Sequence, residues 1–456
     1  MAPAGQQERA ALPCERGACE RGACKRGARE RGAGDEALGE PTAGRSFLVT
    51  LVVLTFVMNM LARGVTETFA VFLLPVQNGL GISRADITLT YSVYMLAYGL
   101  SAPFAGQLID RLGARITYAF GLITLGLGYL LAGSATGLWQ YLLCVGLLGG
   151  LGSASLGMIV ASGLLSRWFT TRIGAVMALP YAAIGAGMLI LPPLTQLLLS
   201  TYDWRVTHRL LGAAVLLALP LVMLLPLGRM TAGSAEWRAL RLRAATGARG
   251  HWTVATAVRT SAFWGLFAAY LFTSVAAYSV LPHSVAYLVE QGFNPLMAAS
   301  AFGTTGMLSA LGILGVGWLS DRFGRLSTVT VTYFSTMLGI TLLILVMRWH
   351  SLLLVYGFVL FFGLMQGARG PIIVALVAVL FSGGGVGAIY GTLSLAMGLG
   401  AALGSWSSGL LYELTGSYVA SFLLAIGGCL AGLSTFWLVP SLRDEAMGEP
   451  RTARPQ

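Results

Sequence analysis

Apolar stretches of about twenty residues recur along the whole chain, and this recurrence limits the fold more than any other feature. A stretch of that length crosses the hydrocarbon core of a bilayer as a helix. Charged residues make up only 10% of the 456 residues, against about 25% in a soluble domain. We therefore expect a multi-pass membrane protein. The twelve spans that the pattern predicts lie at about residues 46–76, 86–108, 114–133, 138–162, 173–200, 207–227, 262–289, 296–319, 327–347, 352–380, 386–411 and 417–439.

We expect these spans to be helices. Lipid offers the backbone no hydrogen bonds, so only helices and closed barrels cross it. The segments lack the strict alternation of polar and apolar residues that a barrel strand needs. Gly146 with Gly150, and Gly400 with Gly404, have the spacing that lets membrane helices approach closely. The expected fold class is an all-α membrane protein.

The arginines indicate which side of the membrane each loop faces. With both termini placed in the cytoplasm, the outer loops hold Arg84, Arg205, Arg209 and Arg348. The cytoplasmic segments then hold Arg45, Arg111, Arg115, Arg167, Arg172, Arg229, Arg238, Arg241, Arg243, Arg249, Arg259, Arg322, Arg325, Arg443, Arg451 and Arg454. Such a bias is the one that the positive-inside rule describes. We therefore attribute the net charge of +11 to topology in a plasma or inner membrane, and expect lipid but no nucleic acid as a partner.

Residues 1–44 differ from the rest of the chain. The repeat CERGA CERGA CKRGA RERGA, from Cys14 to Ala33, alternates charge and has almost no large apolar group, so we expect a disordered tail. A start codon assigned too early is the alternative for this segment. The cysteines of the repeat lack zinc-knuckle spacing, and the first apolar span is too long for the core of a cleavable signal peptide.

Two loop sequences form an internal repeat. GQLIDRLGAR begins at residue 106 and GWLSDRFGRL begins at residue 317, an offset of 317 minus 106, or 211 residues. We infer two six-helix halves joined by a linker. The expected parts are a tail at 1–44, an N-terminal bundle at 45–228, a cytoplasmic linker at 229–260, a C-terminal bundle at 261–440 and a second tail at 441–456.

Both loops resemble the G-x-L-x-D-R-x-G-R-K/R signature of the major facilitator superfamily, and twelve spans in two halves extend that resemblance over nearly the whole chain. Ala114 and Leu326 each replace an expected basic residue. The resemblance implies a gate, at which carboxylates near helix ends and arginine partners lock one cytoplasmic arrangement. The plainer reading, that these residues cap a tight turn, is compatible with that role. The implied gating residues are Gly106, Asp110, Arg111, Gly113, Gly317, Asp321, Arg322 and Gly324.

Within the superfamily, the chain looks like the monocarboxylate transporter and oxalate:formate antiporter group. Three departures accompany this resemblance. Glu67 stands where the group tends to have a lysine, and Ser309 and Ile313 stand where it tends to have an aspartate and an arginine. The stretches that carry the resemblance are residues 63–87, 167–179, 203–213 and 410–422.

Two arginines fall inside predicted spans. An arginine at the bilayer centre costs about 2.5 to 3.5 kcal/mol, and it cannot lose its proton to escape. Arg63 lies near the middle of the first span, with Glu67 one turn further along. Arg369 lies near the middle of the tenth span between Gly367 and Pro371, where we expect a distorted helix. The superfamily resemblance implies that spans one, four, seven and ten line a central cavity, so that both arginines would face it.

These charges are not duplicated by the repeat. A guanidinium grips a carboxylate bidentately, so single-copy arginines at this depth favour a small organic anion as substrate. Glu67 would neutralise Arg63 in the empty site and, when protonated, couple transport to protons. The offset of 211 pairs Arg63 with Ser274, Glu67 with Tyr278, and Arg369 with Met158.

Other polar residues complete the expected site. The substrate-binding set is Arg63, Arg369, Gln366, Asn59 and Tyr278, with Tyr94, Tyr98 and Tyr390 as further hydrogen-bonding candidates. The coupling set is Glu67 and His283, the latter as a proton relay. The structural alternatives are a permanent ion pair for Arg63 and Glu67, backbone carbonyls for Arg369, and packing between helices for the rest.

An enzymatic function is not expected. The sequence shows no phosphate-binding loop, no metal-ligand cluster and no catalytic triad, and the four histidines are scattered. We expect a proton-coupled symporter or an anion exchanger for a monocarboxylate-like substrate, working as a monomer without a cofactor. An exporter of drugs or lipophilic cations is the main alternative, although only Glu67 and Glu413 are intramembrane carboxylates. A signalling receptor would need a larger soluble domain.

Overall fold

The computed structural model describes residues 45–169, 173–234, 237–238, 252–381 and 386–447. The predicted tail at 1–44, residues 235–236 and 239–251 of the predicted linker, and the end of the C-terminal tail lie outside these ranges. Val49–Gln456 forms one compact unit, and the contacts below are those within this unit.

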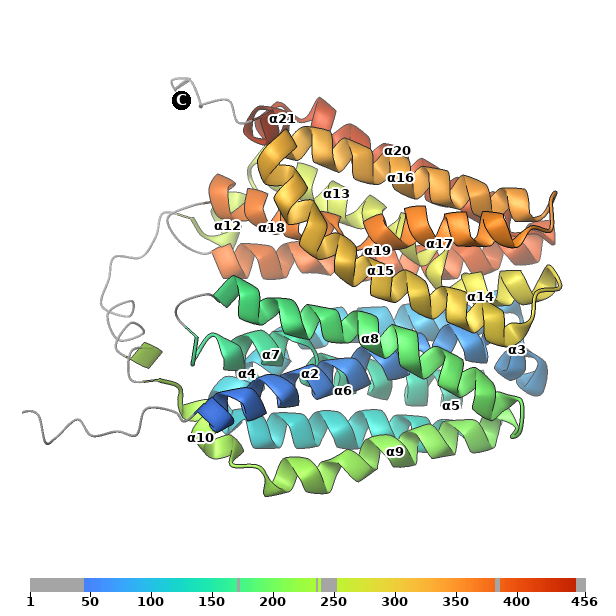
Figure 1. Ribbon diagram of the computed structural model, residues 1–456, viewed down its shortest axis with the longest axis horizontal. Helices are drawn as coiled ribbons and strands as arrows, with labels where there is room; N and C mark the ends of the chain where they lie inside the picture. The colour runs from blue at the N-terminus through green and yellow to red at the C-terminus, as the bar shows by residue number, and fades with distance from the viewer. Residues whose placement is uncertain (1–44, 170–172, 235–236, 239–251, 382–385, 448–456) are drawn as a thin grey trace, which may run out of the picture. The chain divides into compact units, whose positions relative to one another are not determined.

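Helices make up all the regular structure of the described residues (Figure 1). The first half contains α2 (Arg45–Glu67), α3 (Phe69–Leu80), α4 (Arg84–Ala132), α5 (Leu138–Tyr141), a π-helical segment (Leu142–Leu148), α6 (Gly149–Leu156), α7 (Met158–Leu165), α8 (Ile173–Leu199), α9 (Trp204–Leu224) and α10 (Leu227–Ala232). The second half contains α12 (Val254–Ala257), α13 (Ser261–Tyr278), α14 (Leu281–Glu290), α15 (Pro295–Phe323), α16 (Arg325–Val346), α17 (Leu352–Gln366), α18 (Arg369–Leu380), α19 (Val386–Thr415), α20 (Val419–Leu438) and α21 (Pro440–Met447). The predicted all-α membrane fold is thereby confirmed.

Eleven of these helical segments are long and apolar enough to span a membrane. One of them, α4, has 49 residues and includes two of the predicted spans. At about 1.5 Å per residue it would be roughly twice as long as the hydrocarbon core is thick. Gly113, between the two predicted spans, breaks it with a φ of 81° that an L side chain rarely adopts. The count of twelve crossings stays a prediction, because length and composition identify eleven segments.

Short polar residues fix where several helices begin. Ser83 accepts a hydrogen bond from the amide of Asp86 at the start of α4, and Asp203 caps α9 through the amide of Val206. An N-cap oxygen satisfies an amide that has no partner within the helix. The turns between spans are therefore encoded locally, next to the apolar runs that they separate.

Four helical spans are interrupted near their middles. The breaks fall at Thr68 between α2 and α3, at Gly157 between α6 and α7, at Ser279 and Val280 between α13 and α14, and at Gly367 and Ala368 between α17 and α18. The breaks obey the sequence repeat, since the offset of 211 carries Thr68 to Ser279 and Gly157 to Ala368. A broken helix leaves backbone groups free for side chains or ligands. The distortion that Gly367 and Pro371 predicted beside Arg369 is confirmed.

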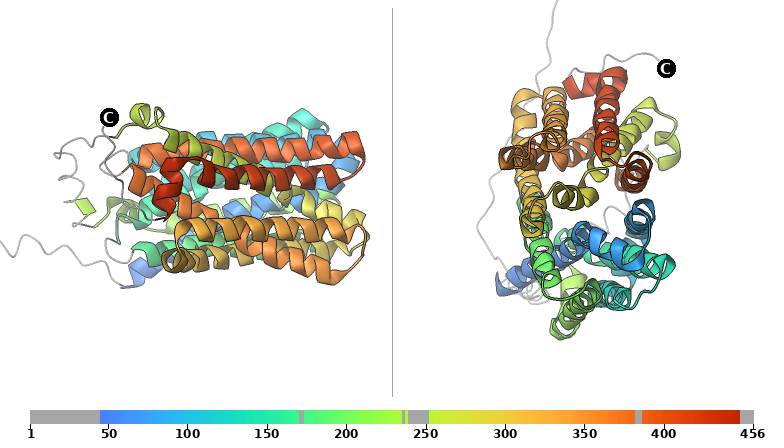
Figure 2. Two further views of the ribbon diagram at one scale, coloured as in Figure 1. Left: turned by 90° about the horizontal axis from the view of Figure 1, so that it is seen from above. Right: turned by 90° about the vertical axis from the view of Figure 1, so that its right-hand side faces the viewer.

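Close helix contacts join the two halves, which Figure 2 shows in two further views. The Ser92 hydroxyl on α4 donates to the Ala402 carbonyl on α19 at 2.7 Å. On the other side of the unit, a Cβ added to Gly185 of α8 would lie 2.9 Å from the Gly306 carbonyl of α15. Helices α4 and α8 of the first half therefore pack on α19 and α15 of the second.

The predicted glycine contacts between helices are also present. A Cβ added to Gly150 would lie 2.6 Å from that of Ala97, and one added to Gly404 would lie 2.6 Å from the Val275 carbonyl. Real Cβ atoms do not approach so closely, so these glycines set the spacing of α6 on α4 and of α19 on α13.

We predict that Gly404→Ala lowers the melting temperature of the purified protein. The added methyl group overpacks the α13–α19 contact, which costs about 1 to 3 kcal/mol. The matched control is Gly427→Ala on α20, where nothing lies within 4 Å of the added Cβ. Alanine favours helices over glycine, so the control should melt at the same temperature or slightly higher. Equal melting of both variants would contradict the close contact.

Candidate functional site

Arg63 and Glu67 form a buried ion pair at the break between α2 and α3. Nη2 of Arg63 donates to Oε1 of Glu67, as their i,i+4 spacing predicts. The two side chains differ in access: 17% of the Arg63 side chain is exposed, against 2% of the Glu67 side chain. Glu67 also accepts a bond from the Tyr91 hydroxyl, at 3.3 Å to Oε2. The carboxylate is thus held behind the guanidinium, which keeps donors free on its exposed side.

Tyrosines surround this guanidinium from both halves of the chain. The hydroxyls of Tyr91, Tyr94 and Tyr278 lie within electrostatic range of Arg63, and so does that of Tyr98. The rings of Tyr91 and Tyr278, on α4 and α13, have their centroids 6.1 Å apart. Arg63 therefore lies where the two halves meet.

A hydrogen-bonded network fixes α2 beside α4 and α6 at this level. The Thr66 hydroxyl lies 2.9 Å from the Tyr94 hydroxyl and 3.1 Å from that of Ser153, and all three residues are buried. Tyr129 donates to the Val65 carbonyl at 2.8 Å, next to the break at Thr68, whose own amide and hydroxyl also donate to it. The backbone that carries Arg63 and Glu67 is therefore anchored by side chains from neighbouring helices.

Arg369 lies in different surroundings from Arg63. Its side chain, 2% exposed, points towards α16, where Nη2 donates to the Thr336 hydroxyl at 2.8 Å and the guanidinium carbon lies 4.4 Å from the centre of the Tyr333 ring. Nη2 also donates to the Met365 carbonyl, at 3.4 Å. Nε and Nη1 have no hydrogen-bond partner within the described ranges. The predicted arrangement, with both guanidiniums on one anion, is therefore not formed in this conformation, because the Tyr333 face and the Thr336 hydroxyl hold Arg369.

The remaining substrate-binding candidates are divided between these surroundings. Asn59 is fully buried one turn before Arg63; its amide donates to the Thr55 carbonyl at 2.8 Å, and its Oδ1 has no partner among the residues described. Tyr278 is the last residue of α13, at the break opposite Glu67. Gln366 is the half-buried last residue of α17, at the break beside Arg369.

His283 lies in a third cluster, which closes the two halves together at the end of the bundle that holds α3 and α14 (Figure 1). Its Nε2 lies 3.1 Å from the Ser405 carbonyl, which can only accept, so Nε2 carries the proton. Its Nδ1 lies 3.2 Å from the Tyr418 hydroxyl. The imidazole is fully buried, and within the described residues its hydrogen bonds reach neither Arg63 nor Glu67.

Arg84 is the centre of this closing cluster. Its guanidinium donates to Gln77 at 2.6 Å, to Glu290 at 2.7 Å and to the Tyr418 hydroxyl, and it lies 4.4 Å from the centre of the Tyr412 ring. Burial raises the pKa of Tyr418, so its phenol stays protonated and donates onward. One ion pair and two aromatic contacts therefore tie α4 to α14 and to the turn before α20.

Sequence reasoning treated Arg84 as an outer-loop charge and did not single out Glu290 or Tyr418. These partners lie 206 and 334 residues from Arg84, beyond any local spacing rule. The available signals were the lone arginine directly after Ser83 and the fact that Arg84 and Tyr418 lie in two stretches that carry the group resemblance, 63–87 and 410–422.

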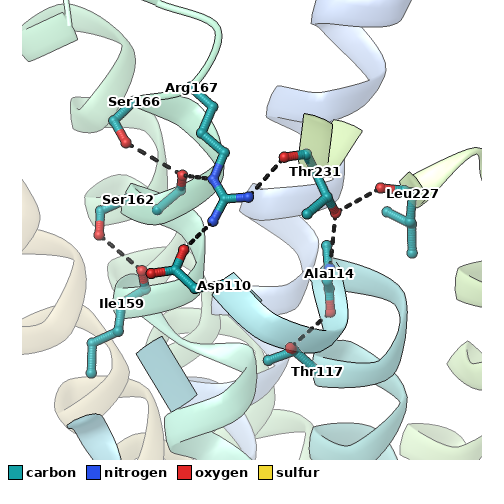
Figure 3. A network of polar contacts seen from close by, with 11 residues as sticks. Asp110, Ala114, Thr117, Ile159, Ser162, Ser166, Arg167, Leu227 and Thr231 are labelled. Carbon is teal, nitrogen blue, oxygen red and sulfur yellow. Dashed lines mark hydrogen bonds and ion pairs between the residues drawn. The ribbon is translucent and has the colours of Figure 1, made fainter. Parts of the chain in front are cut away.

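The first copy of the loop motif forms a network at the opposite end (Figure 3). Asp110 pairs with Arg167 of the segment after α7, at 2.5 Å. Arg167 also donates to the Thr231 carbonyl of α10 at 2.7 Å, while the Thr231 hydroxyl accepts from the Ala114 amide at 2.9 Å. The motif thus holds α10, where the predicted linker begins, against the N-terminal half. Gly113 turns the chain here, whereas Gly106 is only loosely packed and Arg111 is exposed.

The second copy repeats the turn of the first. Gly324 has a φ of 84°, matching Gly113. Arg322 lies over the ring of Trp318 at 5.8 Å, and a Cβ on Gly317 would meet nothing. The Asp321 side chain lies outside the described residues.

Comparison with known proteins agrees with this architecture. The family model described as Major Facilitator Superfamily matches residues 52–368 and 317–455. The chain belongs to the Major Facilitator Superfamily. It is therefore a secondary transporter of the membrane and not an enzyme. Within this superfamily it resembles the monocarboxylate group, as the sequence predicted.

Named relatives cover most of the chain. Monocarboxylate transporter 13 of Rattus norvegicus is 28% identical over 84% of this chain and 87% of its own length. Monocarboxylate transporter 11 of Homo sapiens is 28% identical over 83% of this chain and 79% of its own. The uncharacterized MFS-type transporter YcxA of Bacillus subtilis (strain 168) is 26% identical, over 87% and 95%.

Among solved structures, a D-xylose-proton symporter superposes with a TM-score of 0.67 at 13% identity, over 88% of this chain and 99% of that one. A bacterial homologue of the human lysosomal transporter Spinster, solved in an inward-facing and unoccupied conformation, superposes with a TM-score of 0.62 at 14% identity, over 88% of this chain and 96% of that one. At these identities the likeness shows the fold alone.

We predict that Arg167→Gln releases α10 from the N-terminal half. The change removes three charge-assisted hydrogen bonds, to Asp110, Thr231 and Gly163, each worth about 1.5 to 3 kcal/mol. Amide hydrogen exchange across α10 should become at least tenfold faster. The control is Arg443→Gln, whose exposed pair with Asp444 should matter little. Unchanged exchange in the first variant would show that α10 is held by other contacts.

Proposed function

We propose that this transporter moves a small, monocarboxylate-like organic anion by alternating access, as a proton-coupled symporter or an anion exchanger. The observation that carries the proposal is the arrangement at Arg63, a partly exposed guanidinium whose counter-ion lies behind it and whose tyrosine neighbours come from both halves. A carboxylate reaching this point from the exposed side meets free N–H donors first.

The charge balance supports proton coupling through Glu67. The empty pair is neutral, so a bound anion leaves one excess negative charge in a low-dielectric site. Protonating Glu67 restores neutrality, and its carboxyl remains close to the Tyr91 hydroxyl. The substrate then takes over Arg63 while a proton travels with it. His283, at the closing cluster, would affect coupling only through the conformational change.

Arg369 and Gln366 stay in the proposal as partners from the C-terminal half. In this conformation the guanidinium of Arg369 is held by Tyr333 and Thr336. A cation over an aromatic face is stabilised by about 0.5 to 2 kcal/mol, which an anionic ligand could exceed. The break at Ala368 supplies the hinge for such a movement. Asn59 and Tyr278 are proposed to orient the substrate beside Arg63.

The two polar clusters support an alternating cycle. Arg84, Glu290 and Tyr418 join the halves at one end, whereas the Asp110–Arg167 network at the other end lies within one half. We propose that the Arg84 cluster opens when the motif end closes. By analogy with the superfamily, one chain performs this cycle as a monomer in the cell membrane.

An exporter of lipophilic cations is the competing function. Tyrosine rings and Glu67 would be its natural ligands. The side chain of Arg63 is more exposed than that of Glu67, and this difference argues against a cation exporter. An entering cation would meet the Arg63 guanidinium before it reached the buried carboxylate.

We predict that Arg63→Gln abolishes carboxylate uptake into proteoliposomes, by at least a hundredfold, because the anion loses its buried counter-charge. Since the single variant leaves Glu67 unpaired, the double variant Arg63→Gln/Glu67→Gln keeps the pair neutral and should insert normally, yet also fail to transport. Arg348→Gln, at an exposed position, is the control with normal uptake. Arg369→Gln, measured alongside, tests the partner in the C-terminal half. Full uptake by the double variant would defeat the assignment.

We predict that Glu67→Gln uncouples uptake from protons. Glutamine keeps a hydrogen-bond acceptor for Arg63 and Tyr91 but binds no extra proton. Uptake by the wild-type protein should rise when a pH gradient is imposed, and uptake by the variant should be independent of it. A variant that still responds to the gradient would show that the proton binds elsewhere.

A further inference from the structure

We propose that the substrate is an aromatic carboxylate, bound with its carboxylate on Arg63 and its ring among tyrosines of both halves. The inference rests on the proposed function and names the substrate class of the same site. It is carried by four partly exposed tyrosines, one from each of four helices: Tyr98 of α4, Tyr181 of α8, Tyr278 of α13 and Tyr390 of α19.

Tyr98 and Tyr278 lie within electrostatic range of the guanidinium, and Tyr98 links all four tyrosines. The hydroxyl of Tyr98 is within electrostatic range of Arg63, Tyr278 and Tyr390. That of Tyr181 is within range of Tyr390 and Tyr98. Helices α4 and α8 belong to one half, and α13 and α19 to the other. A ligand between them would therefore touch both halves.

Two of these rings already contact a buried tyrosine. Tyr98 follows Tyr94 on the same face of α4 and stacks on it, with ring centroids 6.3 Å apart and planes 22° apart. The Tyr278 ring is tilted by 39° against that of Tyr91, with centroids 6.1 Å apart. Tyr98 and Tyr278 are themselves partly exposed. An aromatic ligand beside them would add pairs at the 4.5 to 7 Å spacing that aromatic rings prefer.

The hydroxyl groups of these tyrosines are a second reason to infer an aromatic substrate. Those of Tyr98, Tyr181 and Tyr278 have no hydrogen-bond partner in the described part of the chain. The Tyr390 hydroxyl lies 3.2 Å from that of Tyr270. Among the buried tyrosines, the Tyr94 and Tyr129 hydroxyls are paired and that of Tyr118 is not. A site for a short aliphatic acid needs only a few polar contacts close to the carboxylate. Several unpaired phenols in addition suit a longer, flat ligand that carries polar substituents on its ring.

Packing between helices would be enough to explain the four tyrosines if their rings were enclosed. Among the described residues the enclosed tyrosines are a separate set of nine, namely Tyr91, Tyr94, Tyr118, Tyr129, Tyr141, Tyr270, Tyr287, Tyr333 and Tyr418. Residues 91, 94 and 98 occupy one face of α4, and exposure begins only at the last of them. The accessible rings are thus those that a ligand arriving at Arg63 would meet.

Binding of two acids of nearly equal size tests the inference. Benzoate and cyclohexanecarboxylate carry the same carboxylate on a flat and a puckered ring, and each is titrated into the purified wild-type protein by calorimetry. We expect benzoate to bind at least about fivefold more tightly, which corresponds to two added aromatic pairs. Lactate serves as a small aliphatic probe and should bind more weakly than either.

Variants then locate the preference. Tyr98→Leu and Tyr278→Leu should remove most of the benzoate advantage, whereas Tyr98→Phe and Tyr278→Phe should keep it, because the ring remains. Tyr356→Leu, on the exposed face of α17, is the control and should change nothing. Retention of the full preference by both leucine variants would overturn the assignment of these rings.

The outcomes separate this inference from the function on which it rests. Equal affinity for the two ring acids, with binding still lost in Arg63→Gln, would overturn the aromatic substrate and leave an anion transporter. Binding of no carboxylate, with lipophilic cations raising the melting temperature instead, would overturn both.

Discussion

Burial of charge is the constraint on which this structure depends. Each charged side chain deep in the described helices needs either an opposite charge, a free backbone carbonyl or an aromatic face, because lipid and packed protein supply none of the solvation that water does. Arg63 has Glu67, Arg84 has Glu290 with two tyrosine rings, and Arg369 has Tyr333 with the Met365 carbonyl beside a helix break. Together with the Asp110–Arg167 network, these sites are the main polar regions of an otherwise apolar bundle.

The backbone keeps the internal repeat while the side chains depart from it. Breaks at Thr68 and Ser279, and at Gly157 and Ala368, are related by the same offset of 211 residues that relates the two loop motifs. The charges at these breaks are not duplicated. The two halves thus share a backbone but differ in their side chains. An asymmetric ligand requires such a difference, because its carboxylate and its opposite end need different contacts.

Much of this could be predicted from the sequence, for identifiable reasons. Apolar length fixed the helical spans, the i,i+4 spacing predicted the pairing of Arg63 with Glu67, and Gly367 with Pro371 predicted the broken helix at Arg369. All of these are local rules. The direction of the Arg369 side chain could not be predicted. Beside a helix break this direction depends on a contact that is distant in the sequence, here the ring of Tyr333 on α16. The contacts of Arg84 and the hold of Arg167 on Thr231 likewise depend on segments brought together only by folding.

The cluster around Arg84 has a thermodynamic consequence. The donors and acceptors that join the halves there are the Arg84 guanidinium, the Glu290 carboxylate and the Tyr418 phenol, and water can replace these bonds when the halves separate. An apolar contact between the halves would instead expose apolar surface to water when the halves separate, and this exposure would raise the free energy of the open conformation. A polar contact of this kind keeps the closed and open conformations close in free energy. A transporter that passes through both conformations in each cycle needs that small difference.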